Sequence, residues 1–395
     1  MSHELHRLRR QALNPLFAKG SIRAAEPQII RHVDRLITKF EADIVSNRPL
    51  SLFTVLLAFT TDVLYDFIFH IELGMLDDDE RAADWTRTLD ALVQMTTFVK
   101  QFPWLVTLMR TLPNSWLESI DPDTAGIMKL EQDIHRRTTD VVQCFNRSDQ
   151  ISKQDSNYQA PDLITHLLSS SLPEQEKSIE RLAQESFNVT GAGSETTART
   201  LSNALYHLTS NPSIQAAVRT ELRTVMPHHN SSISACSTLE ALPLLSAVVK
   251  ETLRVSPLIS SRLPLVIRTP LQYQSWTIPA GAVVGMTIQK TLNDASVFPD
   301  PKTFDPYRWL QSTPEQLEAM NRAYVPFSRG TRGCVGINLA YAEIYIVLAA
   351  VVRRFDLELY DTIKERDVDF ARDCFIALPT KGSKGIRVLV REAKD

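Results

Sequence analysis

The ten residues 327–336, FSRGTRGCVG, constrain the fold more than any other stretch of this chain. One cysteine, Cys334, stands in a glycine-rich loop, and an apolar run with helical spacing follows at once over residues 337–352. The first turn of a helix leaves backbone N–H groups unpaired, and the helix dipole favours negative charge there. Both effects lower the pKa of a thiol. The arrangement therefore predicts a cysteine thiolate that binds a metal.

The residues around this cysteine suit such a ligand. Gly330 and Gly333 permit a tight turn, and Gly336 has no side chain to block a flat cofactor above the sulfur. Arg332 can pair with an anionic group on that cofactor. A lone cysteine beside a turn is more often buried and inert. Here five positions of the pattern F-x-x-G-x-R-x-C-x-G match together, which argues against a chance match.

This loop resembles the heme-binding loop of the cytochrome P-450 family of heme-thiolate monooxygenases. The resemblance implies that Cys334 is the axial ligand of the heme iron and that Arg332 holds a heme propionate. It also implies that Phe327 packs near the sulfur and that Gly336 lies against the heme. The loop and the run after it look most similar to fungal members that modify secondary metabolites such as terpenoids.

The composition is that of an ordinary globular protein. Of 395 residues, 44% are hydrophobic and 23% are charged, and the formal net charge of −3 gives no sign of nucleic-acid binding. Four scattered cysteines favour a reducing compartment over a disulfide framework. The apolar residues 50–69 are interrupted by Asp62 and Asp66, so they predict a core helix and no membrane span. Without a visible linker, we expect one domain over residues 1–395.

The chain opens with a predicted helix that ends before Pro15. His6 and Arg10 are four residues apart and share a face of it. Taken alone, this segment is typical of a solvated basic helix or of a patch for an acidic partner. It resembles the propionate-binding helix of the family, which implies that Arg10 binds a propionate. His6 stands where the family most often has tryptophan, and it could donate a hydrogen bond to a propionate.

In the family, a membrane anchor, several helices, the first strands of a small sheet and a substrate-contacting loop precede this helix. We find no counterpart of them in residues 1–395. The resemblance therefore implies a chain that is truncated at its N-terminus or whose start codon has been placed too late. The expected fold is the cytochrome P-450 fold without its anchor, first helices and first strands.

Hydrophobic periodicity predicts a mainly α-helical fold with small β-sheets. Helices are expected over residues 21–46, 50–70, 122–146, 174–210, 213–225, 244–255 and 337–352, with a helix, a loop and a helix over 81–118. Pro27 is expected near the start of its helix, and Trp104 and Trp116 in the core or along a substrate channel. A loop is expected over residues 148–159. Strands are expected as a hairpin over 271–286 and as segments over 356–360 and 375–390.

The helix predicted over residues 174–210 has an unusual centre, TGAGSETT, at residues 190–197. Glycine and threonine reduce helix propensity, which proteins tolerate where function needs a kink or a close backbone approach. A helix crossing at small residues would explain the glycines equally well. The segment resembles the oxygen-activation helix of the family. That resemblance implies that Thr196 donates a hydrogen bond near bound dioxygen, that Glu195 conducts protons, and that Ala192 faces the heme and the substrate.

Glu251 and Arg254 are three residues apart on the predicted apolar helix 244–255. This spacing alone is weak, because Glu4 and Arg7 repeat it. Charges in an apolar helix need partners, however, and Arg308 in the segment FDPYRW can supply a third one. The three residues resemble the Glu–Arg–Arg lock of the family, which braces the cysteine loop. The expected role is structural.

In the family, the segment after the lock helix turns beneath the heme and lines the substrate pocket. Ile259, Ser260 and Ser261 are therefore candidates for the lining, and Ile376 for the roof. Many relatives carry a propionate-binding arginine about where this chain has Leu265. Arg262 or Arg268 could take its place.

The four motifs follow one another in the family order, and together they imply a monooxygenase. It would insert one atom of dioxygen into a lipophilic organic substrate, using heme b and electrons that a separate flavoprotein reductase takes from NADPH. The resemblance places it at the cytosolic face of the endoplasmic reticulum, or in the cytoplasm without an anchor. Two alternatives stay open: a heme-thiolate isomerase or dehydratase, and a truncated protein that binds heme or a partner without catalysis.

Overall fold

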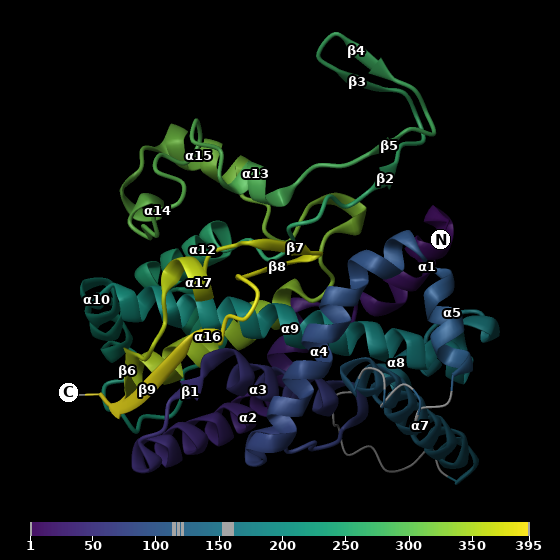
Figure 1. Cartoon of the computed structure of the whole chain (residues 1–395), viewed down its shortest axis with the longest axis horizontal. Helices are drawn as coiled ribbons and strands as arrows, with labels where there is room; N and C mark the ends of the chain where they lie inside the picture. Colours follow the sequence, from purple (N-terminus) through teal and green to yellow (C-terminus); the bar gives the residue numbers. More distant parts are fainter. Residues whose placement is uncertain (1, 113–115, 117–118, 120–121, 152–161, 394–395) are drawn as a thin grey trace.

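A computed structural model describes residues 2–112, 116, 119, 122–151 and 162–393, and it is mostly helical (Figure 1). Its α-helices are α1 (His3–Leu13), α2 (Lys19–Ser46), α3 (Leu52–Phe69), α4 (Asp79–Gln101), α5 (Trp104–Thr111), α7 (Pro122–Ile151), α8 (Leu163–Ser169), α9 (Ile179–Ser210), α10 (Pro212–Arg223), α11 (Cys236–Glu240), α12 (Pro243–Val255), α13 (Ile288–Leu292), α14 (Arg308–Gln311), α15 (Pro314–Ala323), α16 (Ile337–Arg354) and α17 (Lys364–Asp367). Short 3-10 helices are η1 (Met75–Asp77), η2 (Glu174–Lys177) and η3 (Gly330–Arg332).

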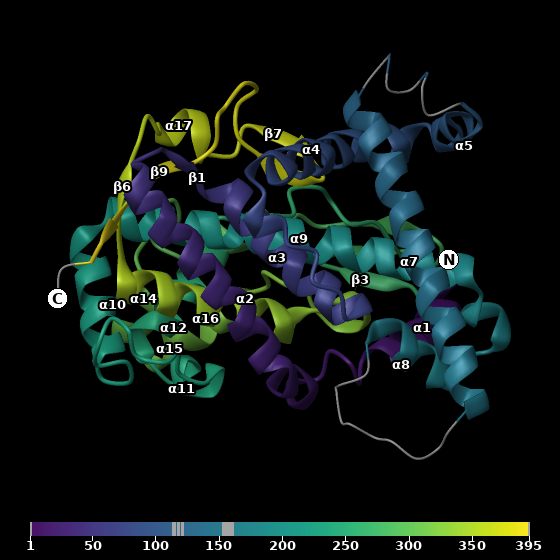
Figure 2. The same ribbon diagram turned by 90° about the horizontal axis from the view of Figure 1, so that it is seen from below.

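The strands are short and form small antiparallel sheets. They are β1 (Leu50–Ser51), β2 (Leu265–Val266), β3 (Leu271–Tyr273), β4 (Trp276–Ile278), β5 (Val283–Val284), β6 (Phe355–Leu359), β7 (Arg372–Cys374), β8 (Ile376–Leu378) and β9 (Arg387–Glu392). The order β1-β9-β6 makes one sheet, and β2–β5, β3–β4 and β7–β8 pair separately. This confirms the predicted class, mainly α with small sheets. Both views place α7 and α8 near the N-terminus and α10 at the C-terminal end (Figure 2).

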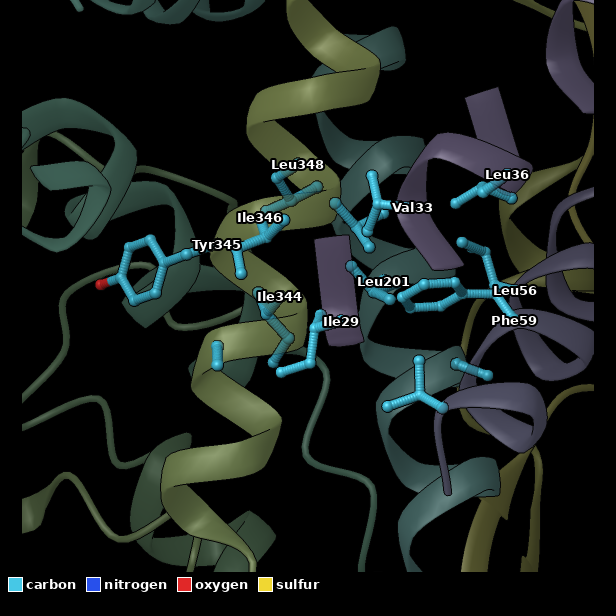
Figure 3. Packing of buried hydrophobic residues seen from close by; sticks show 14 of the residues in the cluster. Ile29, Val33, Leu36, Leu56, Phe59, Leu201, Ile344, Tyr345, Ile346 and Leu348 are labelled. Atoms are coloured by element: carbon cyan, nitrogen blue, oxygen red, sulfur yellow. The ribbon is translucent and has the colours of Figure 1, made fainter. Parts of the chain in front are cut away.

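The core lies where α2, α3, α9 and α16 meet. Ile29 and Val33 of α2 pack with Phe59 of α3, Leu201 of α9 and Ile344 of α16 (Figure 3). Each of these side chains is at most 1% exposed. Burial of one such side chain contributes about 1.5–3 kcal/mol, so this contact holds together helices that are far apart in sequence. The site described below is carried by two of them, α9 and α16.

Helix α3 is buried almost all round. Within the described residues it is the one helix long and apolar enough to cross a membrane, and 89% of that stretch lies inside the protein. Its two acids have partners: Asp62 accepts hydrogen bonds from the backbone N–H groups of Met75 (2.9 Å) and Leu76 (3.2 Å), and Asp66 pairs with His32 (3.1 Å). The helix is therefore placed as predicted for a core element.

Several predicted boundaries were wrong, for local reasons. Helix α9 begins at Ile179, not at 174, because the Ser178 side chain caps it by accepting the backbone N–H of Arg181. Helix α2 begins at Lys19, which places Pro27 inside the helix rather than near its start. Helix α7 continues to Ile151, so residues 148–151 are not loop. The rest of that expected loop, residues 152–161, lies outside the described residues.

Other differences from the predictions concern the strands and two tryptophans. Strand β7 was not predicted, and the expected hairpin over 271–286 has its β3–β4 turn between Tyr273 and Trp276. Trp104 and Trp116 are 60% and 63% exposed, so neither lies in the core. A periodic apolar pattern does not distinguish a core face from an exposed one at the rim of a protein.

Strands β2 to β5 form an arm that extends away from the body of the molecule (Figure 1). Its pairs are Leu265 with Val284 and Leu271 with Ile278. Large apolar side chains on the arm are exposed: Leu265, Val266, Leu271, Tyr273, Trp276 and Val283. Such a patch on a β-arm is uncommon in a soluble monomer.

Candidate active site

The cysteine loop is folded tightly by its own backbone. The N–H of Cys334 donates to the carbonyl of Phe327 (2.9 Å), and the N–H of Gly333 donates to the carbonyl of Gly330 (3.1 Å). Gly330 has a φ of +77°, which side chains other than glycine rarely adopt. The ring of Phe327 packs against Tyr341 at 5.2 Å between ring centroids. The loop thus presents Cys334 just before the first turn of α16.

The environment of the thiol differs from the sequence expectation. Burial by the surrounding loop raises the pKa of the Cys334 thiol, while the N–H of Gly336 and the guanidinium of Arg10 lower it. Of the two effects predicted at a helix start, the backbone N–H is present, but desolvation outweighs it and the charge of Arg10 together.

Helix α1 supplies cationic side chains to the same loop. Arg10 donates to the carbonyls of Gly333 (2.6 Å) and Cys334 (3.2 Å). Burial lowers the pKa of His6, and the charges of Arg332 and Arg10 lower it further, so these three side chains lie together. In the part of the chain that the structure describes, Arg332 makes no hydrogen bond or ion pair. A cluster of cations without a carboxylate favours an anionic ligand.

The space beside the sulfur also suits a large cofactor. A Cβ atom added at Gly336 would meet no atom within 4 Å, so no protein contact explains the glycine. The open space, the single soft sulfur donor of Cys334, the nearby guanidinium groups of Arg332 and Arg10 and the imidazole of His6 together fit a heme with anionic propionates. Arg262 and Arg268, which could have replaced the arginine expected at Leu265, are exposed on the arm side.

Helix α9 carries the second part of the site. The Thr196 hydroxyl donates to the carbonyl of Ala192 (2.7 Å), and Ala192 is exposed. A Cβ at Gly193 would lie 2.8 Å from Cδ1 of Leu64, so this glycine permits the close approach of α3. The alternative explanation of the glycines, a helix crossing, is therefore correct for Gly193. Thr196 and Ala192 are left on a face that α3 does not cover.

Glu195 makes a contact that we did not predict. Its Oε1 accepts a hydrogen bond from Nε of Arg199 (2.6 Å), and Nη2 of Arg199 donates to Asp90 Oδ1 on α4 (2.7 Å). Burial raises the pKa of the Glu195 carboxyl, and the charge of Arg199 opposes this shift. The spacing of Glu195 and Arg199 is visible in the sequence. The part played by Asp90 depends on tertiary packing.

The predicted lock is formed. Glu251 Oε1 binds Nη2 of Arg254 (2.7 Å) and Nε of Arg308 (3.0 Å), and all three residues are buried. Arg254 also donates to the carbonyl of Pro301 (2.7 Å). The lock therefore holds the irregular segment after α13, whereas its expected role of bracing the cysteine loop stays a prediction.

The lock has one member that the sequence analysis missed. Trp309 donates its indole N–H to Glu251 Oε2 (2.9 Å). The backbone N–H of Asp305 donates to Glu251 Oε1 (3.0 Å). The tryptophan follows Arg308 directly, and an indole beside a buried carboxylate was a signal that could have been used.

The candidate pocket residues gather at the β7–β8 hairpin. Ile259 forms a β-bridge with Ile376, and Ile376 packs with Val93 of α4. The hydroxyls of Ser260 and Ser261 both donate to Asp373 Oδ1, at 2.7 and 2.9 Å. The serines thus bind the hairpin, whereas the isoleucines contribute an apolar contact beneath α4.

Comparison with known proteins identifies the class. The family model described as cytochrome P450 matches residues 1–384 of this chain. The chain belongs to the cytochrome P-450 family, and it is a heme-dependent oxidoreductase of the monooxygenase type. Membership implies a heme and a redox partner.

Individual relatives agree with this assignment. The chain is 34% identical over 391 residues to the N-acetyltryptophan 6-hydroxylase of Emericella nidulans, covering 99% of this chain and 75% of that protein. It is 35% identical over 395 residues to the fusicoccadiene C-8 hydroxylase of Phomopsis amygdali, covering 99% and 74%. The crystal structure of the cytochrome CYP102L1 superposes with a TM-score of 0.75 at 18% identity, covering 97% of this chain and 78% of that one.

Proposed function

We propose that this chain binds heme b through the Cys334 thiolate and oxidises a lipophilic secondary metabolite. Arg332 and His6 would hold the propionates, with Arg10 bracing the cysteine loop through its carbonyls. When bound, the heme supplies the activation of dioxygen. The protein contributes the sulfur ligand, the pocket and the delivery of protons. The observation that carries this proposal is the cation cluster beside a single cysteine, with open space at Gly336.

Proton delivery is assigned to Thr196 and Glu195. The Thr196 hydroxyl donates to the carbonyl of Ala192, and its lone pairs can accept a hydrogen bond from water or substrate. Glu195 is the adjacent titratable group. A hydroxyl on an uncovered helix face, followed along the helix by a buried titratable carboxyl, is suited to hold and pass a proton.

The substrate class is proposed from the pocket and from the relatives. Val93, Ile259 and Ile376 form an apolar contact beneath α4, which favours a lipophilic substrate such as a terpenoid. One relative is named as a hydroxylase of fusicoccadiene and another of N-acetyltryptophan. We rank the terpenoid class first because these three side chains are all aliphatic.

The electrons are proposed to come from NADPH through a separate flavoprotein reductase. Arg7 of α1, which is exposed, is the candidate docking residue, since Arg9 is already paired with Glu176 (2.7 Å). We propose the cytosolic face of the endoplasmic reticulum as the location. Phe98, Phe102 and Trp104 at the α4–α5 corner are 46–64% exposed and would suit a membrane surface. Flotation of the purified chain with phospholipid vesicles tests this location.

The decisive experiment is heme loading followed by turnover. The heme-loaded chain, reduced and exposed to carbon monoxide, is expected to show the thiolate-type Soret band. With a reductase, NADPH and a panel of terpenes and indoles, oxygen uptake is expected to match hydroxylated product. Product without oxygen uptake would indicate an isomerase or dehydratase. Failure to bind heme would leave a non-catalytic protein.

A further inference from the structure

The guanidinium of Arg199 lies between two carboxylates, and one of them belongs to Glu195, the residue before Thr196. Arg199 is bonded to Glu195 on its own helix (2.6 Å) and to Asp90 on α4 (2.7 Å). Its guanidinium also lies over the ring of Phe53 of α3, 4.0 Å from the centroid. Three helices therefore fix one side chain, which is 13% exposed.

The two carboxylates are not equivalent. The side chain of Glu195 is 2% exposed, whereas that of Asp90 is 38% exposed. In the described residues, Oε2 of Glu195 is buried without a hydrogen-bond partner. An unpaired buried carboxylate oxygen is costly, so Glu195 depends on Arg199 to stay ionised. Asp90 reaches solvent and competes for the same guanidinium.

We infer that Arg199 is a positioning residue, which fixes the Glu195 carboxylate and connects it to helix α4 through Asp90. This inference rests on the proposed function of Glu195. Its consequence is that the protonation of Glu195 depends on Asp90 of α4 as well as on Arg199.

The charges around Glu195 predict the direction in which each substitution shifts its pKa. Glu195 is faced by Arg199 of α9 and by Asp90 of α4, and α3 contributes only the uncharged Phe53. Asp90 is additionally faced by Arg372 of β7 and Asp123 of α7. Removing Arg199 takes a positive charge from Glu195 and raises its pKa. Removing the charge of Asp90 takes away a negative charge and lowers it.

The first test uses the heme-loaded chain with its reductase, and it measures product formed per NADPH consumed against pH. Asp90→Asn is expected to move the acid limb of this profile to lower pH, and Arg199→Gln to move it to higher pH by about one unit. Arg199→Lys should restore part of the shift. Arg181→Gln, which breaks an ion pair with Glu185 on the same helix, is the matched control and should leave the profile unchanged.

The second test needs no heme. The infrared carboxylic-acid band of the full chain is followed against pH. Arg199→Gln is expected to add a band at neutral pH that disappears in the double variant Arg199→Gln, Glu195→Gln. If the variants bind heme and turn over but neither the profile nor the band shifts, the inference is wrong while the proposed function stands. If the wild-type chain binds no heme, the proposed function fails, and the infrared result still decides the role of Arg199.

Discussion

The indole N–H of Trp309 donates a hydrogen bond to Oε2 of Glu251, while Oε1 of the same carboxylate binds Arg254 and Arg308. One fully buried carboxylate thus satisfies two guanidinium groups and an indole. Breaking a buried pair by removing one partner costs about 3–5 kcal/mol, because an unpaired charge is left behind.

The first prediction concerns this carboxylate. Glu251→Gln removes the charge that Arg254 and Arg308 require, and it is expected to lower the free energy of unfolding by about 3–5 kcal/mol. Denaturant unfolding of the full chain measures the change. Glu318→Gln is the matched control, since Glu318 and Arg322 form an exposed pair whose loss should not be measurable. Equal stability of the two variants would contradict the role of Glu251.

The second prediction concerns the metal ligand. Cys334→Ser replaces the soft sulfur by a hydroxyl that binds heme iron poorly, so the Soret band typical of a thiolate should be lost in the reduced, carbon-monoxide-bound protein. Cys144→Ser, a change at a cysteine of α7 outside the loop, should keep that band. Retention of the band by Cys334→Ser would refute the assignment of the ligand.

The third prediction concerns the alcohol of α9. Thr196→Val removes the hydroxyl that bonds to the Ala192 carbonyl, and product formation is expected to fall roughly 100-fold while heme binding is kept. Thr200→Val is the control, because its hydroxyl also bonds to a carbonyl four residues earlier, that of Thr196. A Thr196→Val variant with full product yield per NADPH would show that the hydroxyl carries no proton.

The fourth prediction is a pH dependence at Asp367. Burial raises the pKa of this carboxyl, but hydrogen bonds from Arg366, Ile363 and Ser383 bring it down to about 2. The unfolded value is about 3.9, so the group stabilises the fold above that pH and loses its contribution as the pH falls toward 2. Wild type should exceed Asp367→Asn by about 2 kcal/mol at pH 7, and the difference should shrink below about pH 4.

Chemical unfolding at several pH values measures this difference. Asp369→Asn is a suitable control, because Asp369 is exposed and pairs with Lys364 at 3.4 Å. A constant difference between wild type and Asp367→Asn from neutral to acid pH would show that the pKa is not lowered in the folded state.

The fifth prediction concerns Glu343, where stability is expected to change with pH in the opposite direction. Burial raises the pKa of Glu343 well above its usual value, and a hydrogen bond with Thr197 opposes this. The unfolded chain releases the proton near pH 4.3, whereas the folded chain keeps it, so folding becomes less favourable as the pH rises. The stability of Glu343→Gln relative to wild type should therefore increase with pH. Parallel stability profiles of the two proteins would contradict a neutral Glu343.

The parts of the site that the sequence predicted were those set by local spacing. Cys334, Gly330 and Gly333 belong to one short loop, and Glu251 with Arg254 belongs to one helical turn. Arg308, 57 positions after Glu251, was predicted because buried charges need partners and because the three residues resemble the lock of the family, and the structure places its guanidinium against Glu251 (3.0 Å).

The parts that were missed depend on packing between distant elements. Asp90 lies on α4, 109 residues before Arg199, and nothing in its own neighbourhood indicates the contact. The thiol pKa of Cys334 was predicted from the helix start alone, whereas desolvation is a property of the folded loop. Strand β7 is three residues long and too short for an alternating pattern.

The arm formed by β2 to β5 affects how the purified protein behaves. Trp276 is 71% exposed and Val266 is 66% exposed, and both stand on strands whose outer edges are open in the described residues. Open edges that carry apolar side chains invite pairing between molecules. Concentrated stocks should therefore be handled with a mild detergent. A variant with polar residues in place of Trp276 and Val266 is better suited to crystallisation.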